Sequence, residues 1–545
     1  MRYRNKLLIL IAAVFGLFMA ILDASIVTIA IPTIEQDLKT NIETVTWVLN
    51  SYNLAVAVLL IPAGRVADRF GRKKLFIAGI VVFTAFSLAC GLARHIDVLI
   101  AFRAFQAIGA AIMTPVSLAI LVVAFPPHQR GAAVGIWGAV SAAAGAIGPT
   151  LGGVLTQYAS WEWIFFVNVP IGVIAVIACL ILIPESRDVE GAQKIDYPGV
   201  ATLSISLFAL TLGLVRGETV GWSSFFILGL FATFFVFGVL FVITESIVKD
   251  PIIDLRLFRE QTFTAASATM LVLGIGFFGA LFLFVQYLIV VEGYSVLRAA
   301  FAVTPLPATI MVVGPVAGRL SDRYRSQLFV VSGMIVFGIA MFLFSQLSGG
   351  EAYVDIFWRL IVAGIGSGLA FAPLASAAMG ALGGRREGVG AGVFSTSRQV
   401  GFTLGLAVLV AVFLGALHPR LSNAEKQATQ VVQQTNLPDP VKQGIIQGVD
   451  SAVSSASSSA VASGEQQKFD LYDSVKQMAG PDVANANRST LDQLSQKLQA
   501  IFAQAAAGSF DRSFLVAGVL LWLATIPAYF VQRPRRPARS PRTSS

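Results

Sequence analysis

The sequence predicts an all-α integral membrane protein with fourteen transmembrane helices. Of its 545 residues, 56% are hydrophobic and only 13% are charged, which is far more apolar than a soluble chain of this length. A bilayer core about 30 Å thick requires roughly 20 apolar residues per helical span. Fourteen stretches approach that length: 7–30, 45–63, 75–93, 98–124, 131–155, 163–183, 199–215, 224–244, 263–291, 299–317, 327–347, 356–382, 388–417 and 513–531.

The first span follows Arg2, Arg4 and Lys6, a pattern that secretory signal peptides share. This apolar run is too long for such a peptide, contains Asp23 and lacks a small-residue cleavage site. We therefore expect it to be retained as the first transmembrane helix.

The distribution of the 39 lysine and arginine residues predicts the orientation of the chain. An even number of spans puts both termini on one side, and the termini and short loops of that side hold 24 of the 39, against 4 in the short loops opposite. Basic residues concentrate in cytoplasmic loops, so the sequence predicts a cell-membrane protein with both termini in the cytoplasm. The net charge of +9 then reports topology and a weak attraction to membrane lipids, not nucleic-acid binding.

A repeated segment divides the predicted spans into two halves. Residues 64–70 read GRVADRF after the second span, and residues 318–324 read GRLSDRY after the tenth. If each marks the same corner of a repeated unit, residues 1–184 form one six-helix half, 263–532 form the other, and 185–262 carry an inserted pair of spans. Parallel halves with a substrate site between them are a recurrent transporter plan.

Two segments differ from the spans in composition. Residues 418–512 are rich in Gln, Ser, Ala and Asn, and we place them outside the cell as partly helical, partly flexible polypeptide. Apolar residues recur at helical spacing from Leu491 to Ile501. This segment is interpreted as a tolerated insertion, with a role in gating or partner docking as the alternative. Residues 533–545 form a basic cytoplasmic tail.

Four motifs carry a resemblance to one transporter family. Residues 64–74 read GRVADRFGRKK, residues 22–27 read LDASIV, and residues 161–172 read WEWIFFVNVPIG. The fifth span carries small residues and a proline at Gly145, Gly148, Pro149, Gly152 and Gly153. Together these resemble the major facilitator superfamily, and within it the fourteen-helix drug:proton antiporters of the EmrB/QacA type. The resemblance covers the chain apart from 418–512, and it implies the major facilitator fold in a 6+2+6 order and multidrug efflux as the function.

In the turn motif, Gly64 and Gly71 permit a tight turn. Asp68 can accept hydrogen bonds from a neighbouring helix end or pair with Arg69 and Arg72. We expect this cluster to latch one conformation; a basic loop that only fixes topology is the alternative.

The resemblance associates the motif of the fifth span with export. Its small residues let two helices approach closely, and Pro149 removes one backbone hydrogen bond. Such a helix suits a moving gate, with ordinary small-residue packing as the alternative.

Charged residues inside spans are functional candidates. Asp23 lies about 16 residues, roughly 24 Å, into the first span, and Arg103 lies roughly 8 Å from the outer end of the fourth, so the two share a depth. We hypothesise that Asp23 is the protonatable group and that a proton and a substrate compete for its carboxylate beside Arg103. A static pair that only locks the two helices is the alternative. Arg359 and Arg398, in the twelfth and thirteenth spans, are second-rank candidates.

The predicted function is proton-coupled efflux of small amphipathic compounds, cationic or neutral, by a monomer. No Gly-Lys dipeptide occurs, which argues against the phosphate-binding loop of an ATP-driven pump. His95, His128 and His418 lack metal-ligand spacing, and Cys90 and Cys179 fall inside spans, so we expect no enzyme, metal, cofactor or disulfide. The tenth span lacks the deep acidic residue that some relatives use for divalent cations. Export of an endogenous lipid or metabolite, and a sensor that transports nothing, are the alternatives.

Overall fold

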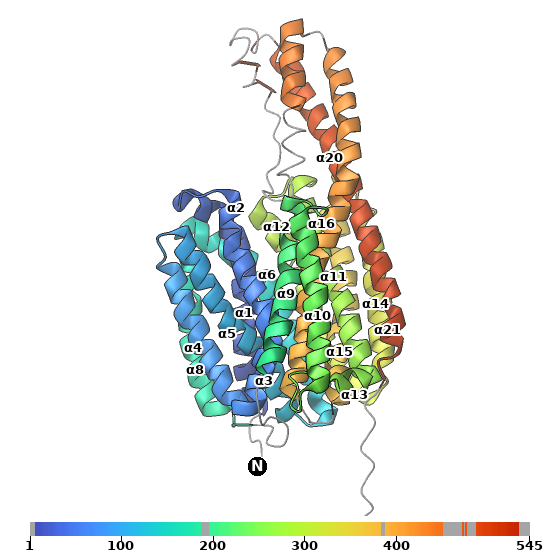
Figure 1. The fold of residues 1–545 in the computed structure, drawn as a ribbon. Coiled ribbons are helices and arrows are strands. Elements are labelled where there is room, and N and C mark those ends of the chain that lie inside the picture. Colours follow the sequence, from blue (N-terminus) through green and yellow to red (C-terminus); the bar gives the residue numbers. More distant parts are fainter. Residues whose placement is uncertain are drawn as a thin grey trace, which may run out of the picture.

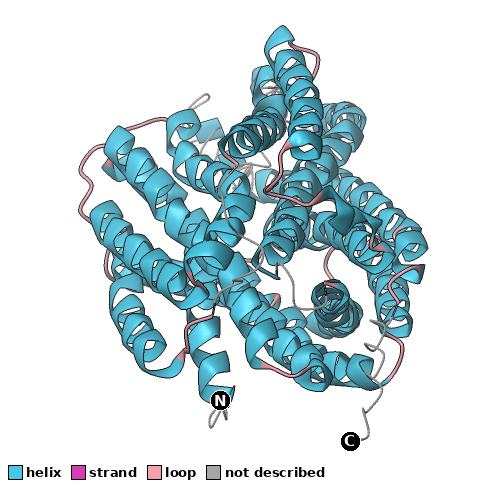
Figure 2. Cartoon of the chain, turned by 60° about the horizontal axis from the view of Figure 1, so that its bottom comes forward, coloured by secondary structure: helices cyan, strands magenta, loops and turns pink. Residues whose placement is uncertain are grey.

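The computed structural model describes residues 6–186, 196–382, 387–435, 437–450, 471–472, 475–476, 485 and 487–532. Within these residues the chain forms helices joined by loops and no strand (Figure 2). Fourteen helical stretches of this part are long and apolar enough to cross a membrane, which is the predicted number. Several predicted features lie outside the described residues: the two N-terminal arginines, part of the connection before the seventh span, and the basic tail 533–545.

The first group of helices supplies the first six spans. Its elements are α1 (Lys6–Asp37), α2 (Ile42–Val45), α3 (Trp47–Phe70), α4 (Arg72–Gly91), α5 (Ile96–Ala124), α6 (Pro127–Tyr158), α7 (Trp163–Phe166) and α8 (Asn168–Leu182). α5 packs on α1, α3, α4 and α6. It is the most enclosed span, with 83% of its most apolar window buried, so polar residues on α5 are shielded from the membrane.

Two further spans follow, α9 (Tyr197–Val220) and α10 (Phe225–Ile247), and η1 (Leu255–Arg259) leads out of them. α9 packs against α3 and α16, whereas α10 packs chiefly on α9 (Figure 1). Only 11% of the most apolar window of α10 is buried, so its phenylalanines and aliphatic side chains suit contact with lipid. This arrangement is consistent with an added pair of spans, and the division of the chain at 185–262 stays a prediction.

The second group of helices supplies the last six spans. Its elements are α11 (Gln261–Val290), α12 (Val296–Ala302), α13 (Pro305–Arg323), α14 (Ser326–Phe344), α15 (Tyr353–Ala381), α16 (Glu387–Gln433), α20 (Arg488–Leu523) and α21 (Thr525–Tyr529). The two groups join mainly through α6 against α13 and α3 against α16.

The bundle has two distinct ends. We call the end with the start of α1 and the α3–α4 turn the basal end; it lies at the bottom of Figure 1, near the N-terminus. At the opposite end α16 and α20 run on beyond the other helices. The short helix α12 also lies near this opposite end.

The helices α16 and α20 confirm that residues 418–512 are partly helical, including the stretch from Leu491 to Ile501. They correct the expected ends of two spans, because α16 continues through Pro419 to Gln433 and α20 already begins at Arg488. The extensions bury an apolar cluster of their own, which includes Val432 of α16 and Leu491 and Leu498 of α20. Because these apolar residues pack on each other, the extensions of α16 and α20 lie side by side beyond the bundle, and we call this pair of extensions the hairpin (Figure 1).

Candidate functional site

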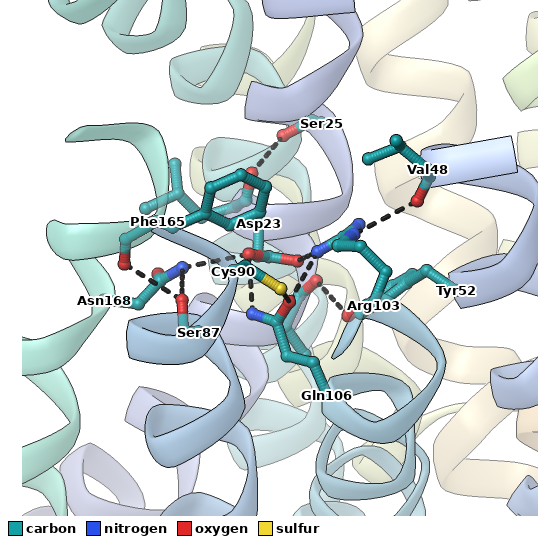
Figure 3. Close-up of polar contacts among 12 residues, drawn as sticks. Asp23, Ser25, Val48, Tyr52, Ser87, Cys90, Arg103, Gln106, Phe165 and Asn168 are labelled. Carbon is teal, nitrogen blue, oxygen red and sulfur yellow. Dashed lines mark hydrogen bonds and ion pairs between the residues drawn. The ribbon is translucent and has the colours of Figure 1, made fainter. Parts of the chain in front are cut away.

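The carboxylate of Asp23 lies at the centre of a buried polar cluster inside the first group of helices (Figure 3). Arg103 of α5 donates from Nη1 to Oδ2 of Asp23 at 2.5 Å. Oδ1 accepts from Nε2 of Gln106, also on α5, and from Nδ2 of Asn168 on α8, each at 2.9 Å. All four side chains are fully buried. The structure thus brings together the two charged residues expected at one depth and adds two amide donors.

The guanidinium of Arg103 is held by three neighbours. Its Nε donates to the carbonyl of Val48 at 3.1 Å, and its Nη1 also donates to Oε1 of Gln106 at 2.7 Å. Its Cζ lies 4.1 Å from the centroid of the Tyr52 ring. Nη2 is buried and has no hydrogen-bond partner among the described residues. Arg103 is therefore positioned by α3 as well as by its own helix.

Further hydrogen bonds orient the amide of Asn168. Its Nδ2 also donates to Oγ of Ser87 on α4 at 3.1 Å, and Ser87 donates in turn to the carbonyl of Phe165 at 2.9 Å. The hydroxyl of Tyr52 donates to the carbonyl of Ala20 on α1 at 3.1 Å. Side chains of α1, α3, α4, α5 and α8 therefore converge on one carboxylate (Figure 3).

Sequence reasoning did not identify four members of this cluster: Gln106, Asn168, Ser87 and Tyr52. An amide side chain inside an apolar span is the signal that could have found Gln106 and Asn168, because buried polar groups need partners. No sequence signal connects Ser87 or Tyr52 to Asp23, since their contacts depend on how separate helices pack.

The stability of the cluster depends on both of its buried charges. In an apolar interior a carboxylate and a guanidinium stabilise each other, and removing one charge costs about 3–5 kcal/mol because the other stays buried and uncompensated. Protonation of Asp23 leaves Arg103 in that position, because no other carboxylate contacts its guanidinium among the described residues. A proton on Asp23 can therefore weaken the attachment of α1 to α5.

The turn motif joins the two groups of helices at the basal end. The carboxylate of Asp68, near the end of α3, accepts from the backbone N–H groups of Gly388 at 3.0 Å and Val389 at 3.1 Å. Arg72 donates to the same carboxylate at 2.9 Å. The first turn of a helix has unpaired N–H groups and a partial positive charge, so Asp68 caps α16 from another helix.

The second copy of the motif repeats this contact with the groups exchanged. Asp322, near the end of α13, accepts through both oxygens from the backbone N–H of Gly131, near the start of α6, at 3.0 and 3.1 Å. A Cβ on Gly64 would collide with the carbonyl of Gly388, and one on Gly318 with the carbonyl of Gly131. Each copy thus uses a glycine for close approach and an aspartate, four residues later, that accepts from a backbone N–H near the start of a helix in the other group; only Asp68 contacts N–H groups of the first turn.

The backbone conformation at the centre of the turn motif explains why that residue is glycine. Gly71 has φ 111°, in the region that disfavours other residues, and it separates α3 from α4. The carboxylate of Glu185 accepts from the backbone N–H of Lys73 at 3.1 Å and so caps α4. Arg69 does not contact Asp68; its guanidinium lies 5.0 Å from the centroid of the Phe70 ring.

Two glycines of α6 allow it to lie close against α1. A Cβ on Gly148 would collide with the side chain of Ser25, and one on Gly152 would lie 2.7 Å from the carbonyl oxygen of Ile26. The hydroxyl of Ser25 donates across the contact to the carbonyl of Ala144 at 3.3 Å. The close approach predicted for this motif is therefore made with the helix that carries Asp23.

The other members of the motif in α6 have different surroundings. A Cβ on Gly145 would make only ordinary contact with Ile21, at 3.8 Å, and one on Gly153 would lie 3.6 Å from Cδ1 of Leu297. Pro149 lies inside α6 without ending it. Gly145 and Gly153 therefore leave room for a methyl group.

No three His, Cys, Asp or Glu side chains among the described residues could hold a metal ion together. Cys90 and Cys179 are both buried and free. The polar cluster around Asp23 is thus built from hydrogen bonds and one ion pair.

Comparison with known proteins identifies the family. The family model described as Major Facilitator Superfamily matches residues 13–406. Multidrug resistance protein Stp of Mycobacterium tuberculosis is 34% identical over 450 residues, which cover 81% of each chain. The tetracenomycin C resistance and export protein of Streptomyces glaucescens is 33% identical over 401 residues, covering 73% of this chain and 74% of the relative.

A solved structure gives an independent view of the fold. A bacterial homologue of the human lysosomal transporter Spinster, in an inward-facing and unoccupied conformation, is similar with a TM-score of 0.53 at 17% identity, over 98% of this chain and 99% of the other. The fold, the fourteen spans and the family match agree. The chain is therefore a multi-pass membrane transporter that belongs to the Major Facilitator Superfamily.

Proposed function

We propose that the protein exports small amphipathic compounds from the cytoplasm and that protons moving inward drive the export. Two relatives that cover most of the chain are described as a multidrug resistance protein and as a resistance and export protein. The observation that supports proton coupling is the fully buried carboxylate of Asp23, whose one ionic partner among the described residues is Arg103. The 24 to 4 distribution of basic residues supports a cell-membrane location with both termini in the cytoplasm.

Asp23 is the proposed proton carrier. When it is ionised, Arg103, Gln106 and Asn168 hold it between α1, α5 and α8. When it takes a proton, the ion pair is lost and the guanidinium of Arg103 needs another acceptor. Because α1 also packs against α6, and α6 packs against α13 of the second group, a shift of α1 on protonation of Asp23 would change the contact between the two groups. A static pair that only locks α1 to α5 remains the alternative.

The paired aspartates at the basal end are the proposed latch. Asp68 caps α16 and Asp322 approaches the start of α6, so both hold the two groups of helices together at this end. With the basal end cytoplasmic, these contacts close the cytoplasmic side. Alternating access then requires both contacts to break before a compound can enter from the cytoplasm.

We propose that the transporter works as a monomer, in contact with lipid along helices such as α10, and without nucleic acid. Export of an endogenous lipid or metabolite is the second candidate within transport. Growth protection against dyes and antibiotics, compared with the lipid profile of a deletion strain, separates the two.

The direct test uses inverted membrane vesicles that contain the full-length chain. An imposed proton gradient, acid inside, is expected to drive uptake of a fluorescent dye, and a protonophore is expected to stop it. Dye uptake at the same rate with and without the gradient would contradict proton coupling. Dye binding with no net flux under any gradient would indicate a sensor.

A further inference from the structure

Arg398 is a buried cation for which the described residues provide no anion. Its side chain on α16 is 6% exposed. The guanidinium Cζ lies 5.1 Å from the Trp137 ring centroid and 5.9 Å from that of Phe402. The Nε is buried without a hydrogen-bond acceptor, and no carboxylate among the described residues forms an ion pair with this arginine.

Three other arginines on the long helices have carboxylate partners, unlike Arg398. Arg103 is paired with Asp23, Arg72 with Asp68 and Arg359 with Glu351. An arginine stays protonated in a protein, and a buried charge is costly unless it is paired. Two aromatic faces supply part of that stabilisation, but they leave the buried Nε of Arg398 without an acceptor.

Arg398 also lies where the two groups of helices meet. It belongs to the second group, whereas Trp137 is on α6 of the first group and donates from Nε1 to Oγ of Ser117 on α5 at 3.0 Å. Phe402, one turn along α16, stacks on Phe278 of α11 with centroids 4.8 Å apart. The cation is therefore bordered by aromatic rings from both groups.

Other buried donors on the same helices lack partners. The hydroxyls of Ser395 and Thr396 on α16 and of Ser267 on α11 have no hydrogen-bond partner among the described residues. A hydroxyl can donate to an anion. A hydroxyl can also accept, so these groups offer polar contacts to a compound of either charge, whereas the unpaired cation of Arg398 is the reverse of what a cationic compound requires.

We propose that Arg398 is the anion subsite of the export pathway, and that the transported compound carries an acidic group, such as a carboxylate or an ionised phenol, next to a flat aromatic ring. The acidic group accepts from the guanidinium, and the ring stacks against Trp137 and Phe402. This inference rests on the proposed export function. It replaces the expectation, made from the sequence, of a cationic or neutral compound.

The test measures binding, which needs no proton coupling. Purified full-length protein is titrated with fluorescein, which is anionic at neutral pH, and with tetramethylrhodamine methyl ester, a cation on the same ring system, and dye anisotropy is recorded. The variants are Arg398→Gln, which removes the charge, and Arg398→Lys, which keeps it and guards against loss of folding. Arg359→Gln is the matched control, because it removes an intramembrane arginine that already has a carboxylate partner.

The expected result is that the wild type binds fluorescein more tightly than the cationic dye. Arg398→Gln is expected to weaken fluorescein binding by at least about tenfold, or about 1.4 kcal/mol, and to leave the cationic dye within about twofold. Arg398→Lys should fall between wild type and Arg398→Gln, since an ammonium keeps the charge without the planar donor fork. Arg359→Gln should bind both dyes like the wild type.

The inference is overturned if the wild type does not bind fluorescein, if Arg398→Gln leaves fluorescein affinity unchanged, or if Arg398→Gln weakens the binding of both dyes equally. If Arg398→Gln does not fold, Arg398→Lys takes its place, and a fluorescein affinity equal to that of the wild type overturns the inference. The outcome is separable from that of the proposed function. Fluorescein binding that depends on Arg398, together with vesicles that show no gradient-driven flux, would retain the anion subsite and reject proton-driven export.

Discussion

At the scale of single residues, the buried pair of Asp23 and Arg103 is the feature on which the proposed mechanism depends. Its two charges could be predicted from sequence, because charged residues are rare inside spans and the length of each helix gives their depth. The amides of Gln106 and Asn168 could not be assigned to the pair, since their bonds to Asp23 exist only after α5 and α8 converge on α1.

The pair makes a prediction about stability. Arg103→Gln leaves the carboxylate of Asp23 buried and uncompensated, so we expect the free energy of unfolding to fall by about 3–5 kcal/mol. The double variant Asp23→Asn with Arg103→Gln removes both charges and is expected to recover most of that loss. Thermal unfolding of the purified variants in detergent measures both. Equal melting temperatures for Arg103→Gln and the wild type would show that the pair contributes nothing to stability.

At the scale of elements, the contact between α1 and α6 depends on glycine at particular positions. Gly152→Ala places a methyl group 2.7 Å from the backbone carbonyl of Ile26, so we expect destabilisation by about 1–3 kcal/mol. Gly138→Ala is the control on the same helix, because nothing lies within 4 Å of its Cβ position. That control is expected to raise stability by about 0.5–1 kcal/mol, as alanine favours helix. Similar unfolding of both variants would contradict the close packing.

The two aspartates of the basal end make a second prediction at this scale. Asp68→Asn or Asp322→Asn weakens charge-assisted bonds to the start of α16 or α6, so the basal end should open more often. Ser321 is 3% exposed, so a cysteine introduced there as Ser321→Cys reports opening of the basal end by its reaction with a maleimide. If each aspartate variant lowers the stability of the closed basal end by about 1.5 kcal/mol, the cysteine should react about tenfold faster.

The control for that experiment is Asp97→Asn, which changes an exposed carboxylate in the first turn of α5. It should leave the labelling rate of the introduced cysteine unchanged. The latch would be rejected if neither aspartate variant labels faster than this control.

The ends of α16 and α20 show where sequence reasoning fails for an element. The transmembrane parts of both helices were predicted, because apolar runs of that length have few alternatives. Helical spacing was recognised from Leu491 to Ile501, but not that this stretch continues the last span, nor that α16 runs on to Gln433, because the residues concerned are mostly polar and their apolar face is buried only when the two helices meet. A short apolar stripe predicts a helix but not its partner.

At the scale of the whole molecule, the projecting hairpin and the transmembrane bundle have distinct apolar cores, and Phe502 packs against both. The core of the hairpin includes Val432 and Leu494, whereas Leu421 and Phe510 already belong to the core of the bundle. The fourteen spans and the fold class could be predicted because each span is a continuous apolar run and the basic residues lie in the short loops between the runs. The packing of α6 on α13 and of α3 on α16 could not, since it depends on shape at positions far apart in sequence.

Distinct cores predict that the hairpin can be removed. A Cβ on Gly508 would lie 3.1 Å from the guanidinium of Arg420, so α16 and α20 are side by side where they leave the bundle. Replacing residues 424–504 by a short Gly-Ser linker should leave the melting temperature of the bundle and dye export near wild type. Loss of export with an intact melting temperature would instead favour a gating or docking role.

The central claim is that Asp23 carries the proton that drives export, and one measurement tests it most directly. Dye uptake into inverted vesicles with an imposed proton gradient is compared between wild type and Asp23→Asn, with Asp97→Asn as the control for an exposed carboxylate. The account predicts gradient-driven uptake in wild type and control, and none in Asp23→Asn at normal levels of folded protein. Intact gradient-driven uptake by Asp23→Asn would contradict it.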